Sequence, residues 1–247
     1  NMVDVAPSYG QAEVRLGSLI SKYRDRLVVA EKTLQRTRDG AWGELNQSLN
    51  RLMIDNFDIY QFHAVGTLEE LDQIFGEKGA MKAFLEAKDQ GLIKNIGITA
   101  HDDMRIVLAA LDRFDFDTVM IPINAGSLIH PAPENDFRPV LEVAKDRNMG
   151  VMAIKSIAKG RWTTSYRNYQ TWYEPLDEQE DIDSALRFTL SQEPVASCPL
   201  VCDVSLWSKM ISAGERFVEL DEDGQSQTVE YLRQKGVRPL FPEDLWQ

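Results

Sequence analysis

The stretch Asp4-Val5-Ala6-Pro7-Ser8-Tyr9-Gly10 decides the fold class, together with the two apolar runs that follow it. Residues 26–30 (RLVVA) and 57–62 (FDIYQF) each have the length and composition of a short buried strand. A lysine, Lys32, follows the first run, and a histidine, His63, follows the second. In a parallel α/β barrel, catalytic side chains come from the C-terminal ends of the strands. The polar residues of these three segments are therefore expected to meet at that end of the sheet.

Helical and strand-like segments alternate along the rest of the chain. Apolar residues at helical spacing predict helices, and short apolar runs between them predict strands. The expected helices cover 11–23, 41–53, 68–90, 102–114, 134–147, 178–191 and 205–217, and the further expected strands cover 93–98, 118–123, 151–154 and 195–201. Parallel strands need crossover helices, so this alternation predicts an α/β fold with a parallel sheet.

Two architectures fit that alternation: an open doubly wound sheet and a (β/α)8 TIM barrel. We favour the barrel because polar residues end several separate strands, and because no Gly-x-Gly-x-x-Gly follows any strand. The chain is then expected to form a single domain over 1–247, with the barrel over 1–218. The tail at 219–247, which includes a short helical piece at 228–236, is expected to pack on the outside of the barrel.

The composition limits the classes of partner. Acidic residues outnumber basic ones by 39 to 27, for a net charge of -12, which argues against a general nucleic-acid or anionic-membrane surface. With neither a secretory leader nor a long apolar run visible, we expect a soluble cytoplasmic protein. Cys198 and Cys202 are too few for a disulfide framework, a metal site or an iron-sulfur cluster, and we expect buried free thiols. A metal-dependent hydrolase is disfavoured because histidines do not cluster.

The opening stretch, with Lys32 and His63, resembles the aldo/keto reductase motif Asp-x-Ala-x-x-Tyr-Gly followed by a Lys and a His. Further matches lie at 10–17 and 48–60. The resemblance implies a barrel enzyme that reduces an aldehyde or ketone to an alcohol with NADPH or NADH, acting on a small-molecule carbonyl substrate. In the family this motif follows the second barrel strand, so the first strand and its helix are expected upstream of residue 1. The oligomeric state is not predicted.

Carbonyl reduction needs a proton at oxygen, and four residues form the candidate catalytic set. Tyr9 is the expected general acid, with Lys32 lowering its pKa from about 10. Asp4 would pair with the buried Lys32, and His63 would orient the carbonyl by donating a hydrogen bond. Taken singly, each residue has a plain structural interpretation, such as a turn residue for Asp4 or packing for Tyr9. Their order and their placement at strand ends favour the catalytic interpretation.

The resemblance also implies a cofactor site further along the chain. Thr99, which follows the strand at 93–98, would lie against the nicotinamide amide. Asn124 follows the strand at 118–123, although a turn residue is an equally good interpretation there. Lys155, Ser156 and Lys159 would surround the phosphates, since a local pair of lysines can attract an anion even in an acidic chain.

Four positions depart from the family pattern: Ala100, Met120, Ile154 and Asp203. Asp203 stands where a basic or small residue is usual and would repel a 2′-phosphate, so the preference between NADPH and NADH stays open. The alternative function is a barrel that has lost productive cofactor binding and acts as a ligand-binding or regulatory protein. The aromatic residues at 161–174 are expected either to line the substrate pocket or to pack a long loop on the barrel.

Overall fold

The structure is a computed structural model that describes residues 1–242. It consists of two compact units, the first formed by 1–101 with 106–119 and the second by 102–105 with the chain from 120 onward. Within the described part of the chain, no helix combines the length and apolar character needed to cross a bilayer. The expectation of a single domain over 1–247 stays a prediction.

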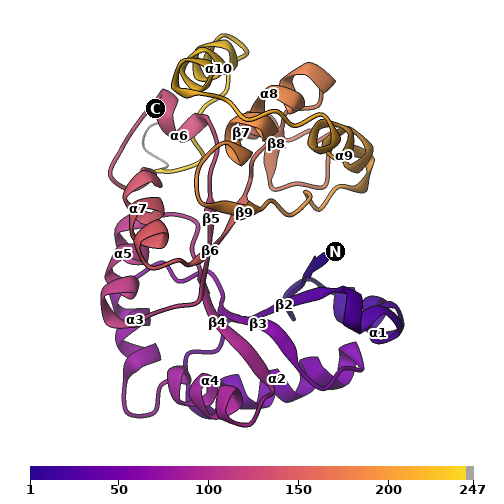
Figure 1. The fold of residues 1–247 in the computed structure, drawn as a ribbon, viewed down its shortest axis with the longest axis vertical. Helices are drawn as coiled ribbons and strands as arrows, with labels where there is room; N and C mark the ends of the chain where they lie inside the picture. Colours follow the sequence, from indigo (N-terminus) through magenta and orange to yellow (C-terminus); the bar gives the residue numbers. More distant parts are fainter. Residues whose placement is uncertain (243–247) are drawn as a thin grey trace. The chain divides into compact units, whose positions relative to one another are not determined.

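The first unit is built on four parallel strands in sequential order (Figure 1): β1 (Met2–Asp4), β2 (Val28–Thr33), β3 (Phe57–Phe62) and β4 (Ile93–Thr99). The strands expected at 26–30, 57–62 and 93–98 are thus confirmed. β2 continues to Thr33, so Lys32 lies within the strand, opposite Gln61 of β3.

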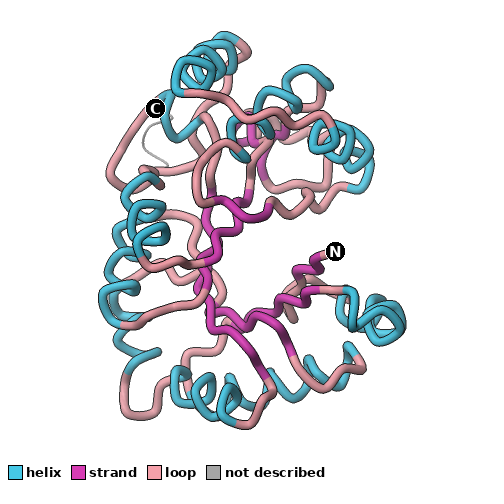
Figure 2. Tube along the Cα trace, viewed as in Figure 1, coloured by secondary structure: helices cyan, strands magenta, loops and turns pink. Residues whose placement is uncertain are grey.

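Helices alternate with these strands (Figure 2): α1 (Ala12–Tyr23), the short turn η1 (Arg24–Arg26), α2 (Arg38–Leu52), α3 (Leu68–Phe75), α4 (Ala80–Asp89) and α5 (Met104–Arg113). Threonine side chains cap two of them, with Thr37 accepting from the N–H of Gly40 and Thr67 from that of Glu70. Aromatic packing joins strand to helix, since the rings of Phe62 and Phe84 stack 3.9 Å apart.

The single helix expected over 68–90 is wrong, because α3 and α4 are separate. The break falls at Gly76 and Gly79. A Cβ on Gly79 would lie 2.1 Å from the carbonyl oxygen of Ile74, so the chain turns where only glycine fits. The next residue, Ala80, donates its N–H to the carbonyl of Arg36, far away in sequence, at 3.0 Å.

The second unit contains the remaining elements. Apart from one antiparallel strand pair, they are β5 (Thr118–Pro122), whose first two residues belong to the first unit, α6 (Gly126–Ile129), α7 (Arg138–Asp146), β6 (Gly150–Ile154), α8 (Gln179–Leu190), β9 (Val195–Ser197), η2 (Val204–Leu206), α9 (Trp207–Glu215) and α10 (Glu222–Gln234). β6 and β9 pair in parallel. β9 ends earlier than expected, at Ser197, before Pro199, which has no N–H for a ladder.

A small antiparallel pair in this unit is not expected from the sequence. β7 (Ala158–Arg161) pairs with β8 (Tyr173–Pro175). The segment expected as a phosphate loop is therefore partly strand, and the stretch between the two strands is the connection of this pair.

The C-terminal tail packs on the second unit. α10 contacts α6 and α8, and it begins earlier than the piece expected at 228–236 because Asp221 caps it by accepting from the N–H of Gly224 at 2.8 Å. The hydroxyl of Tyr231 donates to Asp181 at 2.6 Å. Residues 243–247 of the expected tail lie outside the described residues.

Candidate active site

A buried ion pair joins the first two strands. Lys32 Nζ lies 2.7 Å from Asp4 Oδ2 and 3.0 Å from the carbonyl oxygen of Val5. Asp4 is the last residue of β1, and the chain stays beside β2 because Val5 donates its N–H to Ala30. Lys32 is only 1% exposed, so the cation is fixed inside the unit and compensated by its carboxylate neighbour.

Tyr9 lies in the loop between β1 and α1, beside this ion pair. The loop turns where Tyr9 donates its N–H to Ala6 at 2.9 Å and where Gly10 takes a φ of 62°, a left-handed conformation that favours glycine. Lys32 Nζ is 4.9 Å from the centre of the tyrosine ring. Tyr9 is 46% exposed, so it can meet a molecule from solvent whereas Lys32 cannot.

His63 completes the group. It follows β3 directly and donates its backbone N–H to Thr33 of β2 at 2.9 Å. Its ring stands edge-on to Tyr9, with the ring centres 5.9 Å apart, and 6.3 Å from the ring of His101. The structure therefore brings Asp4, Tyr9, Lys32 and His63 together, while their catalytic roles stay a prediction.

The electrostatics of the group differ from the expectation in one respect. Burial lowers the pKa of Lys32, but the combined effect of Asp4 and the other acidic neighbours outweighs burial. The net pKa of Lys32 is therefore raised, and the ammonium is retained. Partial desolvation raises the pKa of Tyr9 and the charge of Lys32 lowers it, and the net direction is upward. The phenol therefore keeps its proton at neutral pH, as a proton donor must.

Two further residues hold the turn after β3 and were missed in the sequence. The Arg36 guanidinium donates to the carbonyl oxygen of His63 at 2.6 Å and pairs with Glu70 at 2.9 Å. Glu70 in turn accepts the N–H of Gly66 at 2.8 Å. Nothing in the sequence connects Arg36 to a glutamate 34 residues away, because only the fold makes them neighbours.

Thr99, a predicted cofactor contact, lies at the end of β4 and is fully buried. Its hydroxyl accepts the backbone N–H of Ala64 at 2.8 Å. Ala64 has a φ of 53°, unusual for a residue with a Cβ, so the threonine supports a strained turn directly after His63. A structural role for this hydroxyl is thus visible, and its contact with a cofactor stays a prediction.

In the second unit, Asn124 follows β5 and is 3% exposed. Among residues 1–242, its Oδ1 has no hydrogen-bond partner. Gly126 packs closely here, since an added Cβ would lie 3.0 Å from this atom and 2.6 Å from the carbonyl oxygen of Arg238. A buried amide oxygen of this kind is costly unless something donates to it.

Lys155 and Ser156 follow β6. Lys155 is 8% exposed and has a φ of 60°, and its Nζ lies 5.4 Å from the centre of the Trp172 ring. Burial lowers the pKa of Lys155 to about 7, against the charge of Asp102. Ser156 accepts from the thiol of Cys198 at 3.2 Å.

The other residues expected near the phosphates have protein partners. Lys159 lies on β7 and pairs with Glu174 at 2.7 Å, with both side chains partly exposed. Asp203 caps η2 by accepting from the N–H of Ser205 and also accepts the N–H of Gln170 at 2.8 Å. These bonds to Asp203 lower its carboxyl pKa, so it stays negative.

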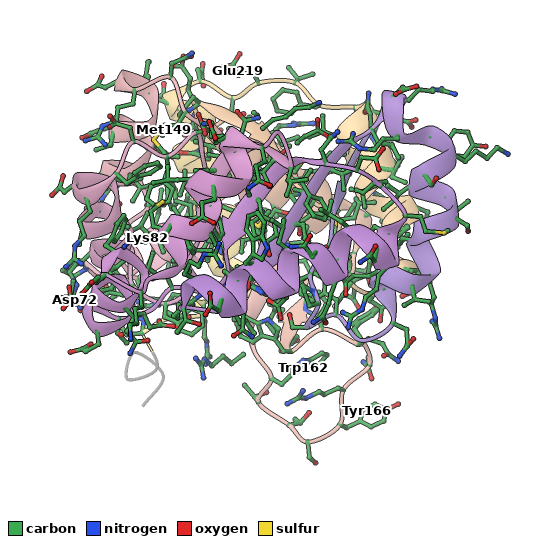
Figure 3. The ribbon with its side chains drawn as sticks, turned by 90° about the horizontal axis from the view of Figure 1, so that it is seen from below. Asp72, Lys82, Met149, Trp162, Tyr166 and Glu219 are labelled. Carbon is green, nitrogen blue, oxygen red and sulfur yellow. The ribbon has the colours of Figure 1, made fainter. Side chains whose placement is uncertain are left out.

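The aromatic residues between β7 and β8 do not form one cluster. Trp162 donates to the carbonyl oxygen of Thr171 at 2.9 Å, which closes the loop, whereas Tyr166 is 78% exposed at its outer end (Figure 3).

Of the thiols, Cys198 is half-buried and Cys202 is exposed, so the expectation of burial is wrong for Cys202. Residues 1–242 contain no group of three or more His, Cys, Asp or Glu side chains placed to hold a metal ion.

Comparison with known proteins connects this geometry to one family. The family model described as Aldo/keto reductase family matches residues 1–232. The uncharacterized oxidoreductase YqkF of Bacillus subtilis (strain 168) is 28% identical over 73% of this chain and 56% of its own length. The aldo-keto reductase YhdN of the same strain is 26% identical over 66% of this chain and 49% of its own length. The chain thus spans about half the length of these curated relatives.

Solved structures share the fold. The holo form of aldo-keto reductase AKR11C1 from Bacillus halodurans has a TM-score of 0.70 at 18% identity, over 98% of this chain and 85% of that chain. An aldo-keto reductase from Klebsiella pneumoniae, solved in complex with NADPH, has a TM-score of 0.66 at 19% identity, over 97% and 81% of the two chains. The expected fold class, an α/β fold of the (β/α)8 barrel type, is confirmed by this likeness.

Proposed function

The chain belongs to the aldo/keto reductase family, and from this premise we propose that it reduces an aldehyde or ketone to an alcohol with a nicotinamide cofactor. The observation that carries the proposal is the meeting of Asp4, Tyr9, Lys32 and His63, with the Lys32 ammonium 2.7 Å from Asp4 and 4.9 Å from the tyrosine ring.

Each of these residues has a part in moving one proton. Tyr9 donates its phenolic proton to the carbonyl oxygen of the substrate, and the growing phenolate charge is balanced by the Lys32 ammonium beside it. Asp4 keeps that ammonium charged and in place although it is buried. His63, held by its backbone bonds to Thr33 and Arg36, orients the carbonyl oxygen toward the phenol.

The cofactor, when bound, supplies the hydride. The residues of the second unit suit such a ligand in two respects. Asn124 Oδ1, which has no hydrogen-bond partner among residues 1–242, is an acceptor for an amide N–H. Lys155 is a buried amine whose protonation an approaching phosphate would favour. We assign Asn124, Lys155, Ser156 and Lys159 to this role.

Asp203 bears on the choice of cofactor. Its carboxylate is held by Ser205 and Gln170 and stays negative, so a 2′-phosphate brought near it would be repelled. We therefore propose NADH as the preferred cofactor if Asp203 faces the adenosine ribose. The combined departures at Ala100, Met120, Ile154 and Asp203 support the second candidate function, a barrel that has lost productive cofactor binding and acts as a ligand-binding or regulatory protein.

Two measurements test the proposal. Titrating the protein with NADH and with NADPH by calorimetry should show binding of at least one, and absence of binding of both would favour the ligand-binding alternative. Oxidation of the bound cofactor by a panel of aldehydes and ketones should then fall by about 100-fold or more in Tyr9→Phe. The matched control is Tyr166→Phe on the exposed loop, which should keep full activity. Undiminished activity in Tyr9→Phe would refute the assignment.

A further inference from the structure

Glu31 is a carboxylic acid buried beside the catalytic pair. It precedes Lys32 on β2 and is 0% exposed. Its Oε1 accepts the backbone N–H of Lys32 at 2.8 Å. The pairing of β1 with β2 ends at Asp4, which lies opposite Ala30. The backbone N–H of Lys32 lies beyond this point, and the Glu31 carboxyl accepts its hydrogen bond in place of a backbone carbonyl of β1.

The surroundings of Glu31 disfavour a negative charge. Side chains alternate along a strand, so Glu31 and Lys32 point to opposite faces of β2, and the ammonium bonds to Asp4 instead. Among residues 1–242, Glu31 Oε2 has no hydrogen-bond partner. Burial is the main reason that the pKa of Glu31 is raised to about 8, against the backbone bond and the charge of Lys32.

Charged and titratable groups face Glu31 from every neighbouring element. Asp4 on β1 and Glu13 on α1 raise its pKa further, although Glu13 is compensated by an ion pair with Arg51 at 2.8 Å. Burial is the main cause of the raised pKa of Tyr60 on β3, and the charges of Glu31 and of Glu44 on α2 add to it. Lys32 on β2 is the one cation among the groups acting directly on Glu31 within the described residues.

We propose that Glu31 is a positioning residue for the proposed carbonyl reduction: it holds the backbone of Lys32, and its charge contributes to how firmly Tyr9 keeps the proton that it donates. The inference rests on the proposed function. Glu31 immediately precedes the lysine whose ammonium lies 4.9 Å from the Tyr9 ring. Burial is the main cause of the raised pKa of Tyr9, and a negative charge on Glu31 adds to it. When Glu31 ionises in alkaline solution, the phenol therefore retains its proton to a higher pH than it would beside a neutral group.

The test compares Glu31→Gln with wild type and with Glu44→Gln. Gln keeps the acceptor for the Lys32 N–H but cannot ionise, and Glu44 is a matched control whose carboxylate accepts from the Thr33 hydroxyl on the same strand. The first readout is the ultraviolet absorbance of the Tyr9 phenolate against pH, taken as the difference from the same protein carrying Tyr9→Phe. The midpoint should move to lower pH in Glu31→Gln and stay at the wild-type value in Glu44→Gln.

The second readout is the pH dependence of kcat/KM, whose alkaline limb should move in the same direction. An unchanged midpoint in folded Glu31→Gln would overturn the inference. If Glu31→Gln does not fold, infrared spectroscopy of the Glu31 carboxyl in the wild-type protein tests the inference instead. A Glu31 that is already ionised at pH 6 would also overturn the inference. A shifted Tyr9 midpoint in a protein that reduces no carbonyl would instead refute the proposed function and leave the coupling of Glu31 to Tyr9 standing.

Discussion

Replacing Glu31 by Gln should make the stability of the protein less dependent on pH. The folded protein raises the pKa of Glu31 from an ordinary 4.5 to about 8. Between these values the folded state holds a proton that the unfolded chain has released, so the free energy of unfolding falls as the pH rises. Each pH unit costs about 1.4 kcal/mol. The cost accumulates to about 3 kcal/mol at pH 7 and saturates above about pH 8.

Urea unfolding from about pH 5 to about pH 8 measures this effect directly. Near pH 5 both proteins carry a neutral group at position 31, so Glu31→Gln should unfold at nearly the wild-type urea concentration. Toward pH 8 the variant should become the more stable of the two, by about 3 kcal/mol or somewhat more. Glu44→Gln should follow the wild-type pH dependence. A difference between Glu31→Gln and wild type that does not grow with pH would refute the reasoning.

Two further substitutions test the interior of the first unit. Lys32→Met leaves the buried Asp4 carboxylate without its cation and should lower the free energy of unfolding by about 3–5 kcal/mol at pH 7. The loss should shrink in acid, because the Asp4 carboxylate then takes up a proton. A loss that is independent of pH would contradict this. Gly97→Ala should lower the free energy of unfolding in urea by about 1–3 kcal/mol, because the added Cβ would lie 2.3 Å from Thr118 Oγ1. Gly43→Ala, which has open space around it, should be neutral or stabilising. Equal effects of the two substitutions would speak against crowding as the cause.

The candidate site could be predicted where it depends on short-range pattern. The short apolar run at 57–62 predicts a strand, and the structure confirms its bounds. The residue after such a strand lies at its C-terminal end, so the position of His63 could be predicted. Lys32 was found for the same reason, although its strand runs on to Thr33. The apolar pattern ends at Ala30 because Glu31 and Lys32 are ionisable, and nothing local indicates that both are buried.

The parts that escaped prediction depend on distant contacts. The start of α4 is tied by the bond from Ala80 to Arg36, which lies far away in sequence, and the pairing of β7 with β8 joins two segments separated by a long connection. The direction of the Tyr9 pKa also needed the structure. A nearby ammonium can be inferred from a motif, but the desolvation that opposes it depends on everything packed around the phenol.

The contrast between an exposed Tyr9 and a buried Lys32 has a consequence for engineering this chain. The proposed proton donor lies in a loop, whereas the ammonium beside it is fixed by the ion pair between β1 and β2. The loop at 6–11 could therefore be exchanged to reshape what reaches the phenol, provided that the phenol itself is retained. The two strands would continue to hold the ion pair, so the loop residues around the phenol and the charge that supports it lie in separable pieces of the chain.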